Sequence, residues 1–297
     1  MTSASQQPHP ARLRLVVAAA VLSIPAVLAV GVAVARTGNQ HPAAMSEQPN
    51  GAATTLTVSP TSDPKTILEQ IAADIHSGPA DPPKATFEYI ETRAWQSTPA
   101  DPSIPAGTGP SRHIQFWTTS LGVSRTVVID ETRGCPPETD ESDDDLGPFD
   151  GPLSSDPDAV RQQILHEPLP PKAIPDVLGQ VAEFYSYRFV PQATRQGVLR
   201  MLARVPGINV RTGVTDQTGR AGFAVTWTYH PPMPFTVTKT LIFDPRTGQL
   251  LSSHSRAHRR PDATTPPQPT DEYEILLLFV ASTYTPNTHT PTVTCTA

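Results

Sequence analysis

The chain has 297 residues, and its residues 36–297 hold 20 basic and 28 acidic side chains, a formal net charge of −8. A surface this acidic argues against binding nucleic acid, because phosphate backbones require clusters of lysine and arginine. About 230 residues follow the N-terminal segments described next, enough for one well-buried core or two small domains.

The first predicted element is a membrane-spanning helix over residues 15–35, a run without charged side chains. About 20 apolar residues are needed to cross the hydrocarbon core of a bilayer as a helix. Arg12 and Arg14 precede the run, so the positive-inside rule predicts a cytoplasmic tail over 1–14 and an extracytoplasmic remainder. We therefore expect a single-pass protein of the cell membrane. The alternative is a cleaved signal peptide, because residues 33–35 form a small-x-small cleavage pattern.

Residues 36–61 are rich in Ala, Thr, Pro, Gln and Ser and are predicted to form a disordered stalk. The folded domain is expected over 62–284, with a C-terminal tail over 285–297. The domain opens with a short amphipathic helix at about 64–76, where Asp63 is the expected N-cap and Pro64 the first helical residue.

Alternating apolar residues then predict an antiparallel meander of three strands around 87–95, 114–116 and 123–129. The period changes to that of helices at 156–164, 177–188 and 191–205. Strands resume at 223–229 and 235–243, and a turn over 244–248 joins the second of these to the next strand. The last strand, 273–283, contains a run that is apolar on both faces and is therefore expected to be central.

The element order predicts an α+β fold in which an antiparallel sheet carries a central block of about three helices packed on it. This outline resembles the lipoprotein-carrier and periplasmic sigma-regulator folds. The four turn and helix motifs at 156–159, 202–208, 214–220 and 241–250 also resemble an uncharacterised family of actinobacterial single-pass membrane proteins. The resemblance covers about residues 84–284, and genes of that family often lie beside those of extracytoplasmic-function sigma factors. Because many members have a longer cytoplasmic segment, the short tail here argues against direct binding of a sigma factor.

The chain has two cysteines, Cys135 and Cys295. In an oxidising compartment they are expected to form a disulfide that holds the C-terminal tail against the loop after an early strand. The alternatives are two buried thiols or a bond to another chain.

Catalytic and metal motifs are incomplete. Ser62 and Lys65 have the spacing of the nucleophile pair in penicillin-interacting serine enzymes, but the companion motifs are missing, so helix capping is the preferred interpretation. The acidic run 138–145 lacks the Gly and Glu that a calcium loop of the EF-hand type requires, and is expected to be a solvated, disordered segment. His254 and His258 have no third ligand in sight, so no metal and no cofactor is predicted.

Five aromatic residues at alternating strand positions are either core residues or the lining of a groove for a lipid or peptide: Tyr89, Trp95, Trp117, Trp227 and Tyr229. The sequence as a whole favours a non-enzymatic, membrane-anchored extracytoplasmic module that binds or senses an envelope protein or an apolar ligand. A cell-envelope hydrolase with an unrecognised serine site and a structural envelope protein are the alternatives.

Overall fold

The computed structural model describes residues 63–75, 78–97, 111–119, 124–130, 138–142, 151–165, 176–231, 235–260 and 272–288, with the backbone alone for 138–142. All of them belong to one compact unit of the chain, residues 53–297. The helices are α1 (Pro64–Asp74), α2 (Pro157–Leu165), α3 (Val177–Tyr187) and α4 (Gln192–Leu202). The strands are β1 (Phe87–Ser97), β2 (Ser111–Thr118), β3 (Ser124–Asp130), β4 (Glu138–Ser142), β5 (Asn209–Thr215), β6 (Ala221–Tyr229), β7 (Phe235–Phe243), β8 (Leu250–Arg259) and β9 (Tyr273–Thr285).

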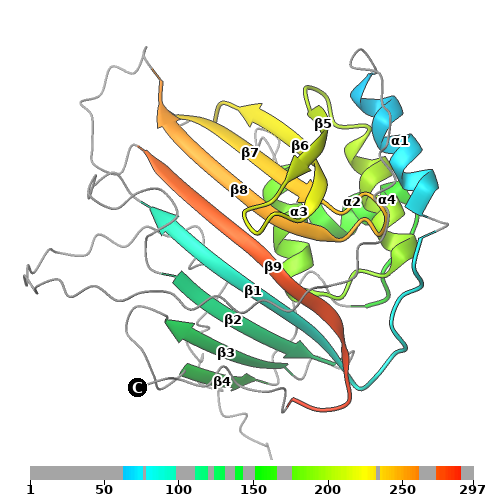
Figure 1. The fold of residues 1–297 in the computed structure, drawn as a ribbon, viewed down its shortest axis with the longest axis vertical. Coiled ribbons are helices and arrows are strands. Elements are labelled where there is room, and N and C mark those ends of the chain that lie inside the picture. The colour runs from blue at the N-terminus through cyan, green and yellow to red at the C-terminus, as the bar shows by residue number, and fades with distance from the viewer. Residues whose placement is uncertain are drawn as a thin grey trace, which may run out of the picture. The chain divides into compact units, whose positions relative to one another are not determined.

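The strands form one sheet in the order β4-β3-β2-β1-β9-β8-β7-β6-β5, and every neighbouring pair is antiparallel (Figure 1). Two four-stranded meanders, β1–β4 and β5–β8, therefore lie on either side of β9. The predicted α+β class with an antiparallel sheet is confirmed.

Strand β9 occupies the middle of the sheet, as the apolar run at 275–280 predicts. It pairs with β1 on one edge and with β8 on the other. Its pairing with β1 contains a bulge, because Phe279 pairs with Thr92 and Ala281 pairs with Glu91. Val280 lies between these pairs and is exposed.

The four helices pack on one face of the sheet, which we call the helix side. Side chains on a strand alternate between the two faces, so the register assigns each residue to one of them. Figure 1 shows the described helices beside β5–β8, with none beside β2–β4. Apolar side chains of all four helices share a single core with the strand residues Phe223, Val225, Leu241, Phe243 and Phe279.

The opposite face, the far side, carries a separate buried cluster on β1, β2 and β3. It consists of Tyr89, Trp117, Val127 and Ile129, with Phe87 packed at its edge. The rings of Tyr89 and Trp117 have centroids 5.1 Å apart. No helix residue belongs to this cluster in the described part of the chain.

Local signals in the sequence account for the starts of α2 and α3 and for the turn at 244–248, whereas the N-cap residues of α1 and α4, Asp63 and Pro191, make no side-chain capping hydrogen bond. The side chain of Asp156 accepts hydrogen bonds from the backbone N–H groups of Asp158 and Ala159, which caps α2. In the β7–β8 turn, Gly248 has φ of 69° and its N–H donates to the carbonyl of Asp244 at 2.9 Å. The left-handed backbone there explains the glycine, because other residues adopt it only at a cost.

The acidic run differs from its prediction as a disordered segment. Residues 138–142 form β4, which pairs with β3 and is the edge strand of the sheet. Charged residues are common on edge strands because they discourage pairing with a second sheet. The hydrogen bonds of the sheet therefore order a segment that composition alone predicts to be mobile.

Candidate functional site

The structure divides the five predicted groove residues between the two faces of the sheet. Tyr89 and Trp117 lie in the far-side cluster, and the alternation along β1 places Trp95 on the same face. Trp227 packs against the helix-side core, and Tyr229 stacks on it with ring centroids 4.7 Å apart. The five residues therefore cannot line one groove, and the two faces need separate consideration.

On the helix side, the sheet continues beyond the helices as a patch of half-buried aliphatic residues. We call it the aliphatic patch, and it consists of Ala94, Ile114, Val128, Ile275 and Leu277. In the register Leu277 pairs with Ala94 and Ile114 pairs with Val128, while Thr92 and Arg112 lie between the two pairs on β1 and β2. Of its members only Leu277 packs against the buried core. The patch is therefore an extension of the core surface that the described helices leave partly open.

Helix α3 forms one border of the aliphatic patch. Gln180, Glu183 and Tyr187 are half-buried and lie three and four residues apart, so they share one stripe of the helix. The ring of Tyr187 meets Phe116 of β2 edge to face at 5.5 Å, which places this stripe against the sheet. The amide of Gln180 donates to Glu183 at 3.2 Å. Polar groups capable of hydrogen bonding thus lie on the face of α3 that is turned toward the sheet.

Burial raises the pKa of Glu183, although the hydrogen bond from Gln180 and the nearby charge of Lys239 partly oppose this. Burial also raises the pKa of Tyr187. A carboxyl group in this setting favours its neutral form more than it would in water. This border therefore suits a neutral polar group better than it suits an anion.

The N-terminus of α3 is fixed to the sheet by an ion pair. The Asp176 side chain accepts a hydrogen bond from the N–H of Gly179 at 2.9 Å and forms an ion pair with Lys239 of β7. A Cβ at Gly179 would clash with atoms of both Asp176 and Lys239, so glycine makes room for the pair. This contact holds the helix, and with it Glu183, in place over the sheet.

The far-side cluster contains a buried hydrogen-bond network between β1 and β2. Glu91 Oε1 lies 2.6 Å from His113 Nε2, and Glu91 Oε2 accepts a hydrogen bond from the Tyr89 hydroxyl at 2.7 Å. Gln115 donates to the same hydroxyl at 3.1 Å. The hydrogen bond from His113 holds the pKa of Glu91 below its usual range. His113 and Gln115 are buried, so the network fixes the pairing of the strands and is closed to a substrate.

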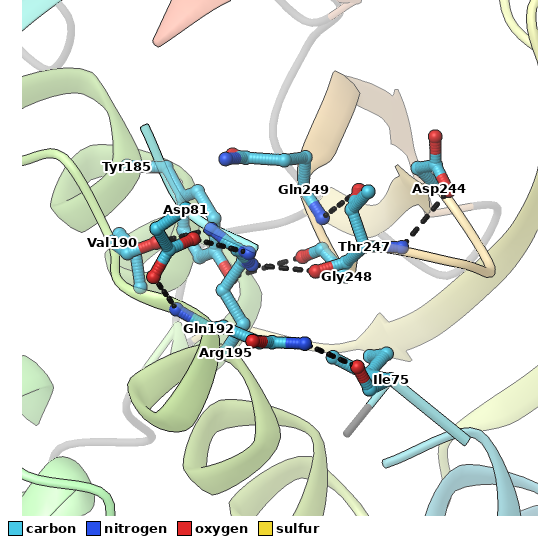
Figure 2. Close-up of polar contacts among 10 residues, drawn as sticks. All are labelled: Ile75, Asp81, Tyr185, Val190, Gln192, Arg195, Asp244, Thr247, Gly248 and Gln249. Atoms are coloured by element: carbon cyan, nitrogen blue, oxygen red, sulfur yellow. Dashed lines mark hydrogen bonds and ion pairs between the residues drawn. The ribbon is translucent and has the colours of Figure 1, made fainter. Parts of the chain in front are cut away.

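A second polar network surrounds Arg195, whose side chain is 2% exposed on α4 (Figure 2). Its guanidinium donates to the carbonyls of Thr247 and Val190 at 2.5 and 2.7 Å and to Asp81 at 2.8 Å. Asp81 also accepts a hydrogen bond from the N–H of Gln192 at 2.7 Å. Each nitrogen of the guanidinium therefore has an acceptor within the chain.

The Arg195 network joins three segments that are distant in sequence. Figure 2 shows the side chain between the segment after α1, the start of α4 and the β7–β8 turn. The hydroxyl of Tyr185 donates to the carbonyl of Gly248 at 3.3 Å and adds α3 to the same assembly. Sequence analysis did not single out Arg195. Since its hydrogen bonds are used within the fold, we assign it a structural role.

The predicted catalytic and metal candidates are not brought together. Ser62 lies outside the described residues, and Lys65 is exposed on α1. His254 and His258 lie on one face of β8 but four residues apart, about 13 Å at the usual rise of a strand, too far to share a metal ion. His254 instead lies 2.5 Å from Glu274 of β9. Within the described ranges, no group of three His, Cys, Asp or Glu side chains is placed to hold a metal.

Other predicted features lie outside the described residues. They are the membrane span at 15–35, the stalk at 36–61, and both cysteines, Cys135 and Cys295. Among the helices that the structure does describe, none is long and apolar enough to cross a membrane. A comparison with protein-family models gave no match to this chain, and a comparison with curated proteins gave none either.

Proposed function

We propose that the chain is a non-enzymatic binding module of the cell envelope that is anchored in the membrane and takes an apolar ligand on the aliphatic patch. The observation that supports this most directly is the patch itself, since it extends the core surface past the described helices. A sheet normally buries its apolar face against another layer. Apolar surface that stays accessible beside polar groups is typical of binding sites.

The chemistry of the border indicates the ligand class. An acyl chain fits a surface on which Ala, Ile, Leu and Val side chains predominate, because it forms no hydrogen bonds. A neutral polar end group would find the amide of Gln180 and the carboxyl of Glu183 on the face of α3 that is turned toward the sheet. An anionic end group is disfavoured there, because the raised pKa of Glu183 reflects poor solvation of negative charge.

The location also supports this class of ligand. A span over 15–35 followed by a stalk of 26 residues, 36–61, would keep the folded domain close to the outer surface of the membrane. A chain of this length has a root-mean-square extent of about 25–30 Å if it is flexible. Membrane lipids and lipidated envelope components would then lie within reach.

The test is photo-crosslinking of the full chain, reconstituted in lipid nanodiscs that contain a neutral lipid with a photoreactive acyl chain. Mass spectrometry of the digested protein then locates the crosslinks. We expect labelled peptides from 111–119, 124–130 and 272–281, in addition to the anchor at 15–35. Crosslinks confined to the anchor would show that the patch takes no acyl chain.

A pair of variants tests whether the crosslinking depends on the aliphatic patch or on the sheet in general. Ile114→Lys introduces a charge into the patch and is expected to reduce its labelling at least tenfold. Thr228→Lys adds the same charge at an exposed position on the far side of β6 and is expected to leave the labelling unchanged. Circular dichroism of both variants checks that each is folded.

The alternative of a serine hydrolase has its own test. Incubation of the full chain with a fluorophosphonate probe is expected to give no specific label. Specific labelling that disappears in Ser62→Ala would contradict the non-enzymatic part of the proposal. The crosslinking result would still be valid, because it tests only whether the patch binds an acyl chain.

A further inference from the structure

Polar and aromatic side chains gather on the helix side at the end of the sheet where β6 and β8 stop and β7 and β9 begin. Residues that lie opposite each other on neighbouring strands share a face, so the register places two adjacent rows there. One row is Trp227, Lys239, Ser255 and Ile275, and the other is Tyr229, Val237, Ala257 and Tyr273. The start of α3 joins them through the ion pair of Asp176 with Lys239. We call six of these residues the polar-aromatic cluster: Asp176, Trp227, Tyr229, Lys239, Ser255 and Tyr273.

Aromatic rings form one part of the polar-aromatic cluster. Trp227 and Tyr229 stack with their planes 18° from parallel. Both are half-buried, as is Tyr273, so each ring keeps part of its surface in contact with water. Tyr and Trp side chains combine an apolar ring with a polar tip. This part of the cluster can therefore contact apolar C–H groups and form hydrogen bonds at the same place.

The charges of the cluster balance each other. Asp176 and Lys239 form an ion pair in which both side chains keep some exposure to solvent. Burial and the nearby Asp176 carboxylate raise the pKa of both Tyr229 and Tyr273, so their hydroxyls stay protonated. An anion would find Lys239 already paired, and a cation would find Asp176 already paired. A neutral hydroxyl group can both donate to Asp176 and accept from Lys239 without disturbing the pair.

We propose that the polar-aromatic cluster binds a neutral sugar ring. The C–H groups of such a ring suit the aromatic surface of Tyr229, and its hydroxyls suit Asp176, Lys239 and Tyr273. Ser255 pairs with Ile275, which belongs to the aliphatic patch, so the cluster borders the patch directly. The sugar comes either from the headgroup of a lipid or from a free glycan. The lipid source rests on the proposed function of the patch, whereas the contacts with the sugar need no acyl chain.

Crosslinking with two photoreactive lipids tests the sugar site separately from the acyl site. The full chain is reconstituted in nanodiscs that contain either a glucosyl diacylglycerol or a diacylglycerol, with the same photoreactive acyl chain in both. We expect the glucosyl lipid to label peptides from 272–281 at least fivefold more strongly. Equal labelling of these peptides by the two lipids would overturn the sugar site and leave the acyl proposal in place.

A soluble glucoside with a photoreactive group on its sugar distinguishes the two sources. Labelling of peptides from 221–231 and 235–243 by this probe would support the site with a free glycan as its ligand, even if no lipid labels the patch. Preferential labelling by the glucosyl lipid, without labelling by the soluble probe, would support the site with a lipid headgroup as its ligand. The proposal fails if neither result is obtained.

A matched pair of tyrosine variants locates the binding. Tyr229→Leu keeps an apolar side chain but removes the ring and the hydroxyl, and is expected to lower labelling by the glucosyl lipid at least fivefold. Tyr284→Leu makes the same change at a half-buried tyrosine near the other end of β9, where the ring packs on Phe189, and is expected to leave the labelling unchanged. Circular dichroism shows whether both variants are folded. Native-level labelling of folded Tyr229→Leu would overturn the assignment of the sugar to this cluster.

Discussion

Removal of the Arg195 side chain is expected to destabilise the domain strongly. Arg195→Met keeps most of the aliphatic volume but leaves the Asp81 carboxylate without its cation and two carbonyls without their donor. Loss of one partner of a buried ion pair costs about 3–5 kcal/mol. Asp81 keeps some contact with water and the N–H of Gln192, so we expect about 3 kcal/mol.

A matched control lies on the same helix. Arg200 is 38% exposed, and its Nε lies 3.8 Å from a carboxylate oxygen of Glu69, which is also exposed. Ion pairs of this kind contribute about 0–1 kcal/mol. Arg200→Met therefore changes the same residue type in α4 by the same amount of charge but is expected to cost less than 1 kcal/mol.

Urea unfolding of the full chain in a mild detergent, followed by tryptophan fluorescence, measures both variants against the native protein. A loss of 3 kcal/mol is a large part of the 5–15 kcal/mol that holds a typical domain together. It should lower the midpoint by about 1–2 M urea at the slopes usual for domains of moderate size. If the two variants lose the same free energy, the structural role assigned to the Arg195 network is wrong.

Two further predictions concern a turn and a carboxyl group. Gly248→Ala is expected to lower the free energy of unfolding by about 3 kcal/mol, because its backbone is left-handed and the new Cβ would lie 2.7 Å from Ile75 Cδ1. Gly213 is also left-handed, but a Cβ there would meet open space, so Gly213→Ala should lower it by about 1 kcal/mol. Thermal unfolding compares the two, and equal losses would contradict the role of the contact. Because the pKa of Glu183 is raised in the folded state, its protonated form contributes stability that is lost as pH rises above the unfolded value of about 4.3. The melting temperature of Glu183→Gln should therefore rise relative to that of the native protein between pH 4 and pH 7. A difference in melting temperature that stays constant across this range would refute the raised pKa of Glu183.

The elements of the fold could be predicted because their signals are local. The stripe of Val160 and Ile164 and the cap at Asp156 lie within a few residues of each other, and the observed α2 begins where they predict. The turn at 244–248 is likewise specified by its own residues. The edge strand β4 was missed because its order comes from pairing with β3 and not from its acidic composition.

The faces of the strands could not be assigned from local patterns. Alternation shows that Tyr89 and Trp95 share a face, and that Trp227 and Tyr229 share a face. Whether the two pairs lie on the same face depends on the register through β9 and β8, which connects segments far apart in the chain. A groove that combined all five aromatic residues was therefore beyond what the sequence could test.

Arg195 did carry a signal that could have been found. It lies three, four and seven residues before Val198, Leu199 and Leu202, which places its side chain on the buried stripe of α4. An arginine at a core position indicates an ion pair, because a buried charge without a partner is too costly. Its partner, Asp81, lies 114 residues earlier in a segment without regular structure, so the pair itself could not be predicted.

The position of β9 explains why residues 275–280 are all apolar. The strand completes the sheet between two meanders, so it needs partners on both edges and apolar residues on both faces. Phe279 reaches the helix-side core, whereas Leu278 is buried on the far side, where it pairs with Arg93. Strands β1 and β8 would each be an unprotected edge without it, which favours association with other chains. Within the sheet the two meanders meet through β9. Outside it, the Arg188–Glu88 ion pair and the contact of Tyr187 with Phe116 also join the α3 region to β1 and β2, so β9 and α3 together connect the two halves of the described domain.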